Sequence, residues 1–277
     1  MRTFRFGHGS WDLGQRVYLM GIVNCTPDSF SDGGHYFHWE DAVTRAETLL
    51  ADGADVVDLG GESTRPGHQP VSVAEEWGRL GPVLTELRHR RPDAVISVDT
   101  HKAEVAARAI AAGADIINDI WGLMGDPGML RVVAASQVGV VMMFNQDPAF
   151  LPGELAIDRM LDFFARGLLQ AGEAGVGPDR ILVDPGLGFG YAVEDNWTVL
   201  RNLPRFRGLG AGMLVGPSRK RFLGHLTGRP PAERDVATAA VAVLAAEAGM
   251  DVVRVHEIAP TRDAMRVWGA WKQVWQP

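Results

Sequence analysis

Apolar runs alternate with alanine-rich helical stretches along nearly the whole chain. The apolar runs are typical of strands buried on both faces, and they lie at 18–24, 55–60, 94–99, 115–120, 139–144, 181–184, 212–217 and 251–255. The helical stretches lie near 38–51, 73–90, 102–112, 128–136, 155–174, 193–202, 233–248 and 260–274. Eight strand–helix units in about 260 residues predict an α/β fold, the (β/α)8 TIM barrel. Because periodicity does not show closure, a doubly wound open sheet is the alternative.

A weak internal repeat marks the ends of three helical stretches. It reads ADGADVVDLG at 51–60, AAGADIINDI at 111–120 and EAGMDVVRVH at 247–256, with a glycine that ends the helix and an aspartate before the strand. Such a glycine is a helix C-cap, and a short connection follows it. The segment TFRFGHGSWDLG at 3–14 predicts a short hairpin before the first barrel strand. No linker separates the units, so we expect one domain over 1–277.

Polar residues stand where the apolar runs end. They are Asn24, Asp58, Asp99, Asn118, Asp184 and Ser218. The carboxyl ends of parallel strands meet at one rim, where such folds hold their ligands. Buried carboxylates and amides are costly unless they are paired. A heterocycle with N–H donors would satisfy them, and the alternative is an internal network of aspartates with Lys102 or Lys220.

Two long loops carry candidate chemistry. NCTPDSFSDGG at 24–34 is long for a βα connection, and its oxygen-bearing side chains suit Mg²⁺ bound with a phosphate. The alternative is an ordinary polar loop. In GGESTRPG at 60–67, Arg65 has the geometry to bind a carboxylate or phosphate. The alternative there is a simple ion pair between Arg65 and Glu62.

Three further motifs follow later strands. The glycines of DPGLGFG at 184–190 match a dinucleotide fingerprint only weakly, so a turn that leaves room for a ligand is the better interpretation. SRK at 218–220 and RVH at 254–256 end the seventh and eighth strands, where barrels frequently bind phosphate. Arg254 and His256 are two apart on a strand and therefore point the same way.

Composition narrows the class of protein. The chain has 277 residues and a net charge of −7, with no basic block, which argues against binding to nucleic acid or to a membrane surface. Cys25 is the single cysteine, so no internal disulfide forms, as is usual in a reducing compartment. No apolar run reaches the roughly 18 residues of a membrane span. With a polar N-terminus, these features predict a cytoplasmic enzyme.

The five motifs NCTPDSFSDGG, GGESTRPG, DPGLGFG, SRK and RVH, in this order, resemble those of the dihydropteroate synthases, pterin-binding enzymes built on a (β/α)8 barrel. The resemblance covers about residues 18–270. It implies a transferase of folate biosynthesis that condenses 6-hydroxymethyl-7,8-dihydropterin pyrophosphate with 4-aminobenzoate. It also implies Mg²⁺ as cofactor, a homodimer and sensitivity to sulfonamides.

The resemblance assigns roles by position. The pterin residues are Asp99, Asn118, Met143, Asp184 and Lys220. The pyrophosphate residues are Asn24, Arg254 and His256, and the metal residues are Asn24 and Asp32. The 4-aminobenzoate residues are Phe30, Thr64, Arg65, Pro66, Phe189 and Ser218. The catalytic set is Asn24, Asp99, Lys220, Arg254 and His256, and Asp58 matches a further position near the site.

Two positions depart from the family pattern, Tyr191 after DPGLGFG and Phe144 after the fifth strand. They leave two other functions open. One is a non-catalytic protein that binds a pterin. The other is a methyltransferase domain that binds methyltetrahydrofolate on the same barrel, although such a domain needs neither a pyrophosphate site nor the loop at 24–34.

Overall fold

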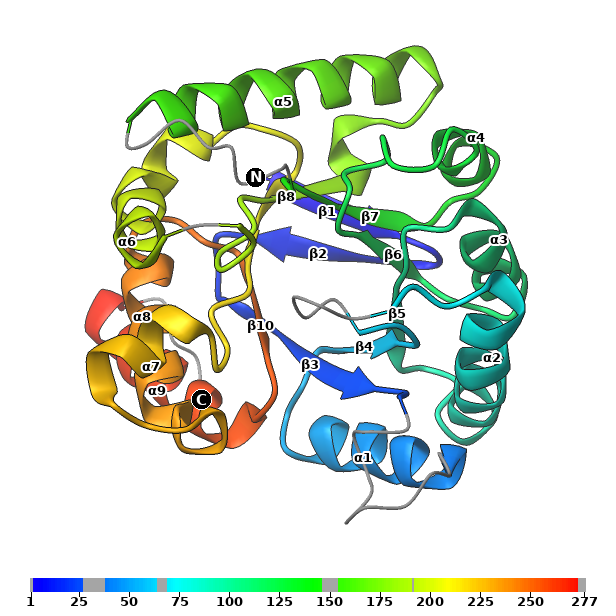
Figure 1. Ribbon diagram of the computed structural model, residues 1–277, viewed down its shortest axis with the longest axis horizontal. Coiled ribbons are helices and arrows are strands. Elements are labelled where there is room, and N and C mark those ends of the chain that lie inside the picture. Colours follow the sequence, from blue (N-terminus) through cyan, green and yellow to red (C-terminus); the bar gives the residue numbers. More distant parts are fainter. Residues whose placement is uncertain (1, 27–37, 64–68, 146–153, 191, 274–277) are drawn as a thin grey trace.

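The computed structural model describes residues 2–26, 38–63, 69–145, 154–190 and 192–273. Eight parallel strands form a closed barrel in the order β10-β3-β4-β5-β6-β7-β8-β9, with helices around it (Figure 1). The strands are β3 Tyr18–Asn24, β4 Val56–Gly60, β5 Val95–Asp99, β6 Ile116–Asp119, β7 Gly139–Met143, β8 Ile181–Asp184, β9 Gly212–Val215 and β10 Val252–Val255. Closure confirms the (β/α)8 prediction and excludes the open sheet.

The helices follow the strands as expected, with one exception. They are α1 Trp39–Ala51, α2 Val73–Arg90, α3 Ala103–Ala111, α4 Met129–Ala134, α5 Glu154–Glu173, α6 Val193–Asn202, α7 Arg221–Thr227, α8 Asp235–Glu247 and α9 Ile258–Lys272. Short 3-10 turns lie at Pro178–Arg180, Leu203–Phe206 and Pro231–Glu233. The sequence prediction was wrong in placing a single helix between β9 and β10. It missed α7 because that helix has only 7 residues and ends at Gly228 in a left-handed conformation (φ 67°).

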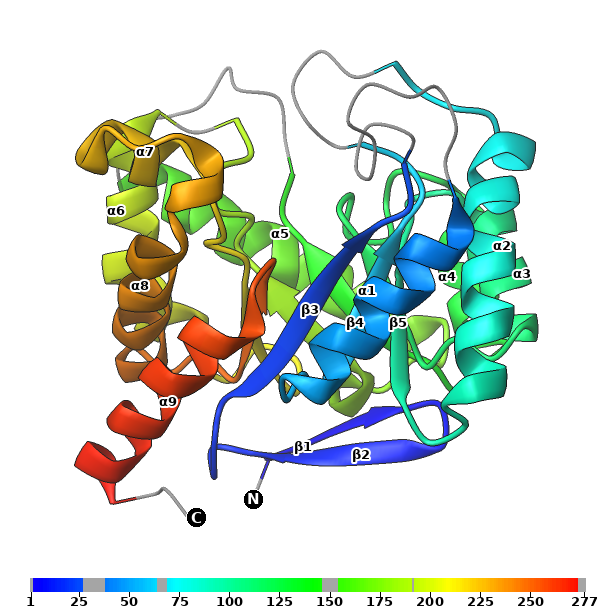
Figure 2. The ribbon, with the colours of Figure 1, turned by 90° about the horizontal axis from the view of Figure 1, so that it is seen from below.

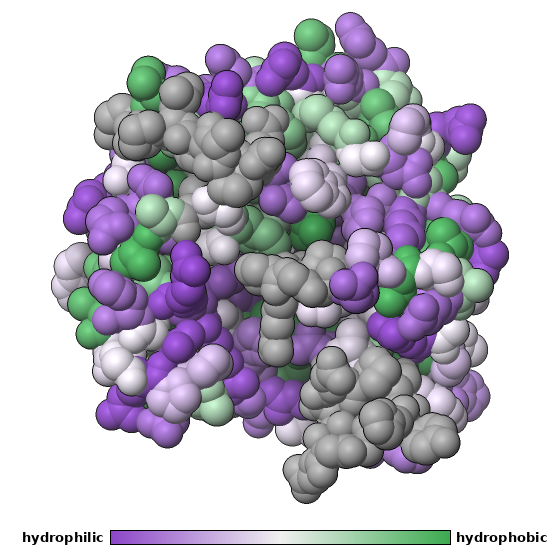
Figure 3. Space-filling view, in the orientation of Figure 1, coloured by the Kyte–Doolittle hydropathy of each residue, from purple (hydrophilic) through white to green (hydrophobic). Residues whose placement is uncertain are grey.

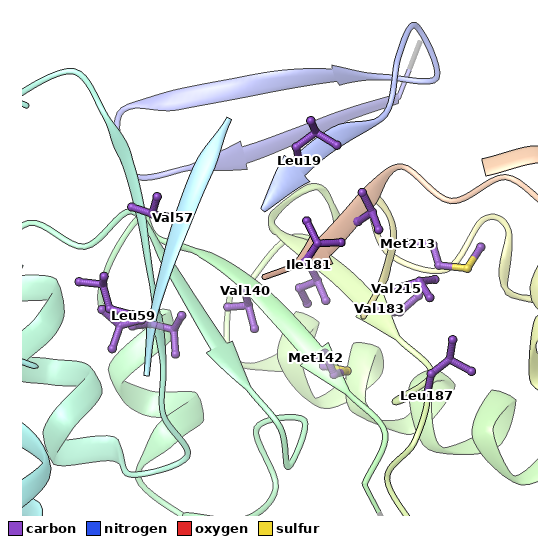
Figure 4. Close-up of a cluster of buried hydrophobic side chains, with 14 of the residues drawn as sticks. Leu19, Val57, Leu59, Val140, Met142, Ile181, Val183, Leu187, Met213 and Val215 are labelled. Atoms are coloured by element: carbon purple, nitrogen blue, oxygen red, sulfur yellow. The ribbon is translucent and has the colours of Figure 1, made fainter. Parts of the chain in front are cut away.

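The main hydrophobic core lies between the barrel and its helices. The outward side chains of the strands supply one side of it, as Figure 4 shows for Leu19, Val57, Val140 and Val183. All four are buried. A strand that packs outward on helices and inward on the barrel interior has to be apolar on both faces, which explains the continuous runs in the sequence.

The predicted hairpin is present as β1 Arg2–Phe6 and β2 Gly9–Leu13. It lies across the amino-terminal end of the barrel strands, opposite the end at which the strands point toward the loops (Figure 2). Phe4, Phe6 and Trp11 pack into the barrel interior, and the Trp11 ring stacks on Tyr18 with centroids 4.4 Å apart. The hairpin therefore closes this end of the barrel with aromatic side chains.

The internal repeat anchors one strand to the next at the same end. Its glycines are left-handed, at Gly53 (φ 101°), Gly113 (φ 97°) and Gly249 (φ 101°). Each repeat aspartate accepts a backbone N–H from the neighbouring strand and a hydrogen bond from an arginine: Asp55 from Leu19 and Arg16, Asp115 from Ile96 and Arg88, Asp251 from Met213 and Arg2. The repeat is therefore structural, as the sequence predicts.

None of the helices in the described part of the chain combines the length and the hydrophobicity that a membrane crossing requires.

Candidate active site

The interior of the barrel changes from apolar to polar within two residues along most strands. Near the hairpin, the interior side chains are apolar; they include Met20, Val56, Val95, Ile116, Val141, Leu182, Leu214 and Val252. Two residues further along five of these strands stand Asp58, Ser97, Asn118, Asp184 and Arg254. Side chains two apart on a strand point to the same side of the sheet. The polar layer therefore lies directly above the apolar one, toward the carboxyl ends of the strands.

A pocket opens above this layer. It is lined by Asp99, Asn118, Ile120, Met143, Asp184, Leu187, Phe189, Gly216, Lys220 and Arg254. All five residues assigned to the pterin by resemblance are among them. Figure 3 faces this end of the barrel, and hydrophilic residues are spread over much of the visible surface. A small, partly apolar pocket with convergent carboxylates, an amide and two cations suits a flat polar heterocycle.

Arg254 lies at the centre of the charge network. Its Nε donates to Asp58 Oδ2 at 2.7 Å, and its Nη2 donates to Asp99 Oδ2 at 2.8 Å. Asn118 Nδ2 also donates to Asp58 Oδ2, at 3.0 Å. Asp58 is fully buried, and its second oxygen has no hydrogen-bond partner among the described residues. One guanidinium thus holds two carboxylates that would otherwise repel each other.

Lys220 enters the pocket from the segment after β9, the strand that pairs with β10 and lies next to Arg254. Its Nζ lies 4.1 Å from the centre of the Phe189 ring, a cation–π contact. The glycine-rich turn makes room for it, because a Cβ on Gly188 (φ +79°) would lie 2.7 Å from Lys220 Cδ. The turn is held by a hydrogen bond of 2.8 Å from Gly186 N to Asp184 Oδ1. The motif DPGLGFG therefore forms a turn that leaves space beside the pocket, as predicted, although the Lys220 side chain fills part of that space.

Burial shifts the pKa values of the titratable groups in the pocket. Burial raises the pKa of Asp99 to about 7, with repulsion from Asp58 and against the attraction of Arg254. Burial likewise raises the pKa of Asp184 to about 6, opposed by the hydrogen bond from Gly186. Burial and then Arg254 lower the pKa of Lys220 to about 8. These groups therefore change charge near neutral pH, as groups at functional sites often do.

His256 and Ser218 form a pair beside the pocket without lining it. Their Nδ1 and Oγ atoms are 2.8 Å apart, and the His256 backbone N–H donates to the same hydroxyl at 3.1 Å. Burial, followed by the charges of Arg219, Arg254 and Lys220, lowers the pKa of His256 to about 3. The imidazole is therefore neutral at pH 7, so it can serve an anion as a hydrogen-bond donor and not as a cation.

The structure brings most of the predicted residues to one end of the barrel. Asn24 ends β3, half-buried, on the same side as the interior residue Met20. Phe30, Asp32, Thr64, Arg65 and Pro66 lie outside the described residues, as does Tyr191. Phe144 is buried with its ring against Phe163, at 5.1 Å between centroids. That departure from the family pattern therefore lies in the core and not in the pocket.

Sequence reasoning missed or misplaced several contacts. It grouped Asp58 with the residues that end the apolar runs, although the predicted strand covered 55–60; β4 does extend to Gly60, so Asp58 lies within the strand, where it binds Arg254. It offered Lys102 as a partner for the strand-end aspartates, but Lys102 binds Glu62 and Glu76 instead. Ile120 was not identified, although its position two residues after Asn118 placed it on the inward face.

Comparison with known proteins places these features in a family. A family model described as pterin binding enzyme matches residues 20–256. The chain is 42% identical over 259 residues to the dihydropteroate synthase of Synechocystis sp., which covers 91% of this chain and 89% of that protein.

Two solved structures are similar over nearly the full length. The Xanthomonas albilineans dihydropteroate synthase with 4-aminobenzoic acid has a TM-score of 0.91 at 41% identity, covering 99% of this chain and 100% of that one. The Burkholderia cenocepacia dihydropteroate synthase complexed with 7,8-dihydropteroate has a TM-score of 0.87 at 39% identity, covering 98% and 97%.

Proposed function

The chain belongs to the family of pterin-binding enzymes, and from this membership we propose that it is a dihydropteroate synthase. This transferase condenses 6-hydroxymethyl-7,8-dihydropterin pyrophosphate with 4-aminobenzoate, giving 7,8-dihydropteroate and pyrophosphate in folate biosynthesis. The observation that carries the proposal is the pocket in which Asp99, Asn118, Asp184 and Lys220 converge. Relatives of about 40% identity that carry this name, over most of the chain, support it.

The pterin fits the chemistry of the pocket. A 2-amino-4-oxo ring presents adjacent N–H donors on one edge, and the carboxylate of Asp184 accepts two such donors. Asn118 has both a donor and an acceptor for the same ring. Lys220 donates to a ring carbonyl or nitrogen, while Met143 and Ile120 supply apolar contact. The buried carboxylates then gain the hydrogen bonds that justify their desolvation.

We assign the pyrophosphate to Asn24, Arg254 and His256. The hydroxyl of Ser218 accepts the backbone N–H of His256, and we propose that it donates its own proton to His256 Nδ1, 2.8 Å away. That arrangement places the imidazole proton on Nε2, from which a neutral ring donates to a phosphate oxygen. Arg254 has already donated to two carboxylates, so its remaining N–H groups and its charge serve the anion.

Mg²⁺ is proposed as cofactor on the basis of the first loop. Asn24 supplies an amide oxygen, a hard ligand of the kind that Mg²⁺ prefers, at the carboxyl end of β3. The second proposed ligand, Asp32, lies outside the described residues. Within the described ranges there is no cluster of three or more histidine, cysteine or acidic side chains able to hold a metal. When bound there, the cation would neutralise charge on the leaving pyrophosphate.

The 4-aminobenzoate site is proposed from Phe30, Thr64, Arg65, Pro66, Phe189 and Ser218. Of these, the structure describes Phe189 at the pocket wall and Ser218 beside His256. Sulfonamides resemble 4-aminobenzoate in shape and charge distribution, so they should compete for the same place. Competitive inhibition by a sulfonamide against 4-aminobenzoate, and not against the pterin, would support this assignment.

The proposed mechanism begins with ionisation. The C–O bond between the exocyclic carbon and pyrophosphate breaks, and the electron pair leaves with pyrophosphate, which Arg254 stabilises by its charge and Asn24 and His256 by hydrogen bonds. The resulting cation is delocalised over the dihydropterin and is favoured by the carboxylates of Asp99 and Asp184. The 4-aminobenzoate nitrogen then attacks the exocyclic carbon and releases a proton. Scrambling of oxygen-18 from the bridging position during turnover tests the order, and its absence would argue against ionisation first.

We also propose a homodimer through the last helices and a cytoplasmic location. The exposed apolar side chains Leu226, Val236, Leu244 and Val267 lie on α7, α8 and α9, and burying them against a second copy would be favourable. The single cysteine, Cys25, is buried and free, which suits a reducing compartment. Light scattering during gel filtration measures the mass directly, and a mass of one chain would exclude the dimer.

One experiment separates the three functions. Pyrophosphate release is measured from the pterin substrate with and without 4-aminobenzoate. A synthase releases pyrophosphate and forms dihydropteroate in a 4-aminobenzoate-dependent reaction. A non-catalytic paralogue binds the pterin without turnover, and a methyltransferase domain binds methyltetrahydrofolate instead. Either of the last two results would refute the proposed function.

A further inference from the structure

The turn between β9 and α7 contains a residue in an unusual backbone conformation. A hydrogen bond of 3.4 Å from Lys220 N to the carbonyl of Pro217 closes the turn, and Arg219 within it is left-handed (φ 56°). Residues other than glycine keep that conformation only where surrounding contacts enforce it. Both sequence neighbours of Arg219 belong to the site, because Lys220 lines the pocket and Ser218 binds His256. The conformation of Arg219 therefore fixes how these two side chains are directed relative to each other.

The contacts that hold this conformation come from the start of α8, which lies beside α7 (Figure 1). The Arg219 guanidinium binds the Asp235 carboxylate by two hydrogen bonds of 2.9 Å, from Nε and Nη2. The Arg219 N–H donates to Oγ1 of the buried Thr238 at 3.2 Å. Arg234 Nη1 donates to the carbonyls of Arg219 and Lys220, at 3.0 and 3.2 Å. The side chain, the N–H and the carbonyl of one residue are thus all bound by neighbouring side chains of α8 and its first flanking residue.

A second carboxylate joins Arg219 to the segment after β10. Arg219 Nη2 also donates to Glu257 Oε1 at 3.2 Å, and Arg45 Nη2 of α1 donates to the same oxygen at 2.8 Å. Arg45 Nη2 donates in addition to the carbonyl of His256 at 2.6 Å. The cluster therefore holds both members of the Ser218–His256 pair, each through the residue that follows it in the sequence.

Arg219 itself is not among the residues that line the pocket. Its side chain, 24% exposed, is paired with Asp235 and Glu257. A guanidinium that binds a carboxylate through two hydrogen bonds supplies a defined geometry in addition to attraction. Its charge also reaches the site, because burial first and then Arg219 lower the pKa of His256. Arg219 can therefore act on the site through geometry or through charge, and a test has to separate the two.

We infer that Arg219 is a positioning residue: its contacts with α8 fix the conformation of the turn and so place Lys220 and Ser218. The inference rests on the proposed function, in which Lys220 binds the pterin and His256, the partner of Ser218, binds the pyrophosphate. Without the contacts to α8, nothing compensates the strain of the left-handed backbone, so the turn relaxes and the two side chains lose their relative placement.

The test compares Arg219→Met with Arg219→Lys and with the matched control Arg90→Met. Arg90 ends α2, also binds two carboxylates, those of Glu86 and Glu47, and does not line the pocket. The kcat/KM for the pterin substrate is measured at saturating 4-aminobenzoate, at a temperature where calorimetry shows each variant to be folded. Since a displacement of about 1 Å can cost about 10² in rate, Arg219→Met should lower kcat/KM roughly tenfold or more. Arg219→Lys should restore only part of the loss, because an ammonium lacks the fork that binds Asp235, and Arg90→Met should match the wild type.

Asp235→Asn separates positioning from a direct effect of charge. It keeps Arg219 but removes a negative charge near the proposed anion site, so a role through charge alone predicts tighter binding of pyrophosphate. Positioning predicts weaker binding, as in Arg219→Met, and a double variant little worse than the worse single variant, because both changes break the same contact. The affinity for inorganic pyrophosphate in the presence of Mg²⁺ is measured by titration calorimetry, which needs no turnover.

Arg219→Gly is the second variant in case Arg219→Met does not fold. Glycine adopts the left-handed conformation without steric cost, but it no longer binds Asp235, so its kcat/KM should also fall. Wild-type kcat/KM in either folded variant overturns the inference, as does tighter binding of pyrophosphate by Asp235→Asn. If the wild type binds pyrophosphate but forms no dihydropteroate, the proposed function fails, while the calorimetric comparison still decides the inference.

Discussion

Replacing Arg254 by methionine should impair both stability and turnover. The substitution removes the cation between Asp58 and Asp99, whose side chains are 0% and 13% exposed. Breaking a buried ion pair by removing one partner typically costs about 3–5 kcal/mol. Proton uptake by Asp99 limits the loss, because its pKa of about 7 is held down by Arg254 and will rise without it. At roughly 2–4 °C for each kcal/mol in domains of somewhat smaller size, the melting temperature should fall by about 10 °C.

Turnover by Arg254→Met should fall by more than the loss of folded protein alone would cause. Loss of one donor to developing charge typically costs about 10²–10³ in kcat. The assay is pyrophosphate release at saturating 4-aminobenzoate, at a temperature where calorimetry shows the variant to be folded. Arg254→Lys keeps the charge but cannot span both carboxylates, so its turnover should lie between those of the wild type and of Arg254→Met.

The control is Arg229→Met, which removes an exposed ion pair with Glu233 (60% and 58% exposed). Such surface pairs contribute about 0–1 kcal/mol, so neither stability nor turnover should change much. If Arg254→Met keeps turnover within about threefold of the wild type, the assignment of Arg254 to the departing pyrophosphate is wrong. If its melting temperature is unchanged, the two carboxylates do not depend on it.

Four other predictions concern the pocket and the proposed Mg²⁺. The kcat/KM for the pterin should fall as pH drops below about 7, where Asp99 and then Asp184 take up protons, and again above about 8, where Lys220 loses one. The folded pKa values of both carboxyls exceed the ordinary 3.8, so the folded, ligand-free chain binds these protons more tightly than the unfolded chain does. The two groups should therefore lower the stability of the ligand-free chain as pH rises from about 4 to 7 in calorimetric scans. In the variants Asp99→Asn and Asp184→Asn this loss of stability should be smaller than in the wild type, and an equal or larger loss would contradict the prediction. Gly188→Ala should raise KM for the pterin and lower stability by about 1–2 kcal/mol, because it places a Cβ 2.7 Å from Lys220 in a left-handed conformation; Gly172→Ala, in a helix with open space, should be harmless or stabilising. Removing Mg²⁺ with EDTA should stop turnover, and adding Mg²⁺ back should restore it. Asn24→Ala should raise the Mg²⁺ concentration needed for half the maximal rate. Turnover that persists in EDTA would refute Mg²⁺ as the cofactor.

The barrel could be predicted because its signal is repeated. Each strand is an apolar run, and each repeat glycine ends its helix with a left-handed residue, as at Gly53 and Gly113. Polar residues at the ends of these runs then indicated the rim, and motif order indicated the family. Local pattern is sufficient for such features because each depends on a few neighbouring residues.

Pairing across the barrel could not be predicted in the same way. Asp58 and Arg254 are 196 residues apart in the sequence, and no local pattern shows which residue a buried aspartate binds. Lys102 looked equally able to bind an aspartate of the rim, and its partners Glu62 and Glu76 come from other elements. The neutral state of His256 depends on burial and on three surrounding cations, which only the assembled structure brings together.

The aromatic hairpin closes one end of the barrel, so ligands can reach the interior only from the other end. Below the polar layer the barrel is filled by Met20, Val56, Leu182 and their neighbours, with Trp11 and Tyr18 stacked beneath. Everything that enters must leave by the same route. On the proposed function, the ligand that binds deepest in the barrel must bind first and leave last. The single opening therefore imposes an order of substrate binding and product release without any conformational change.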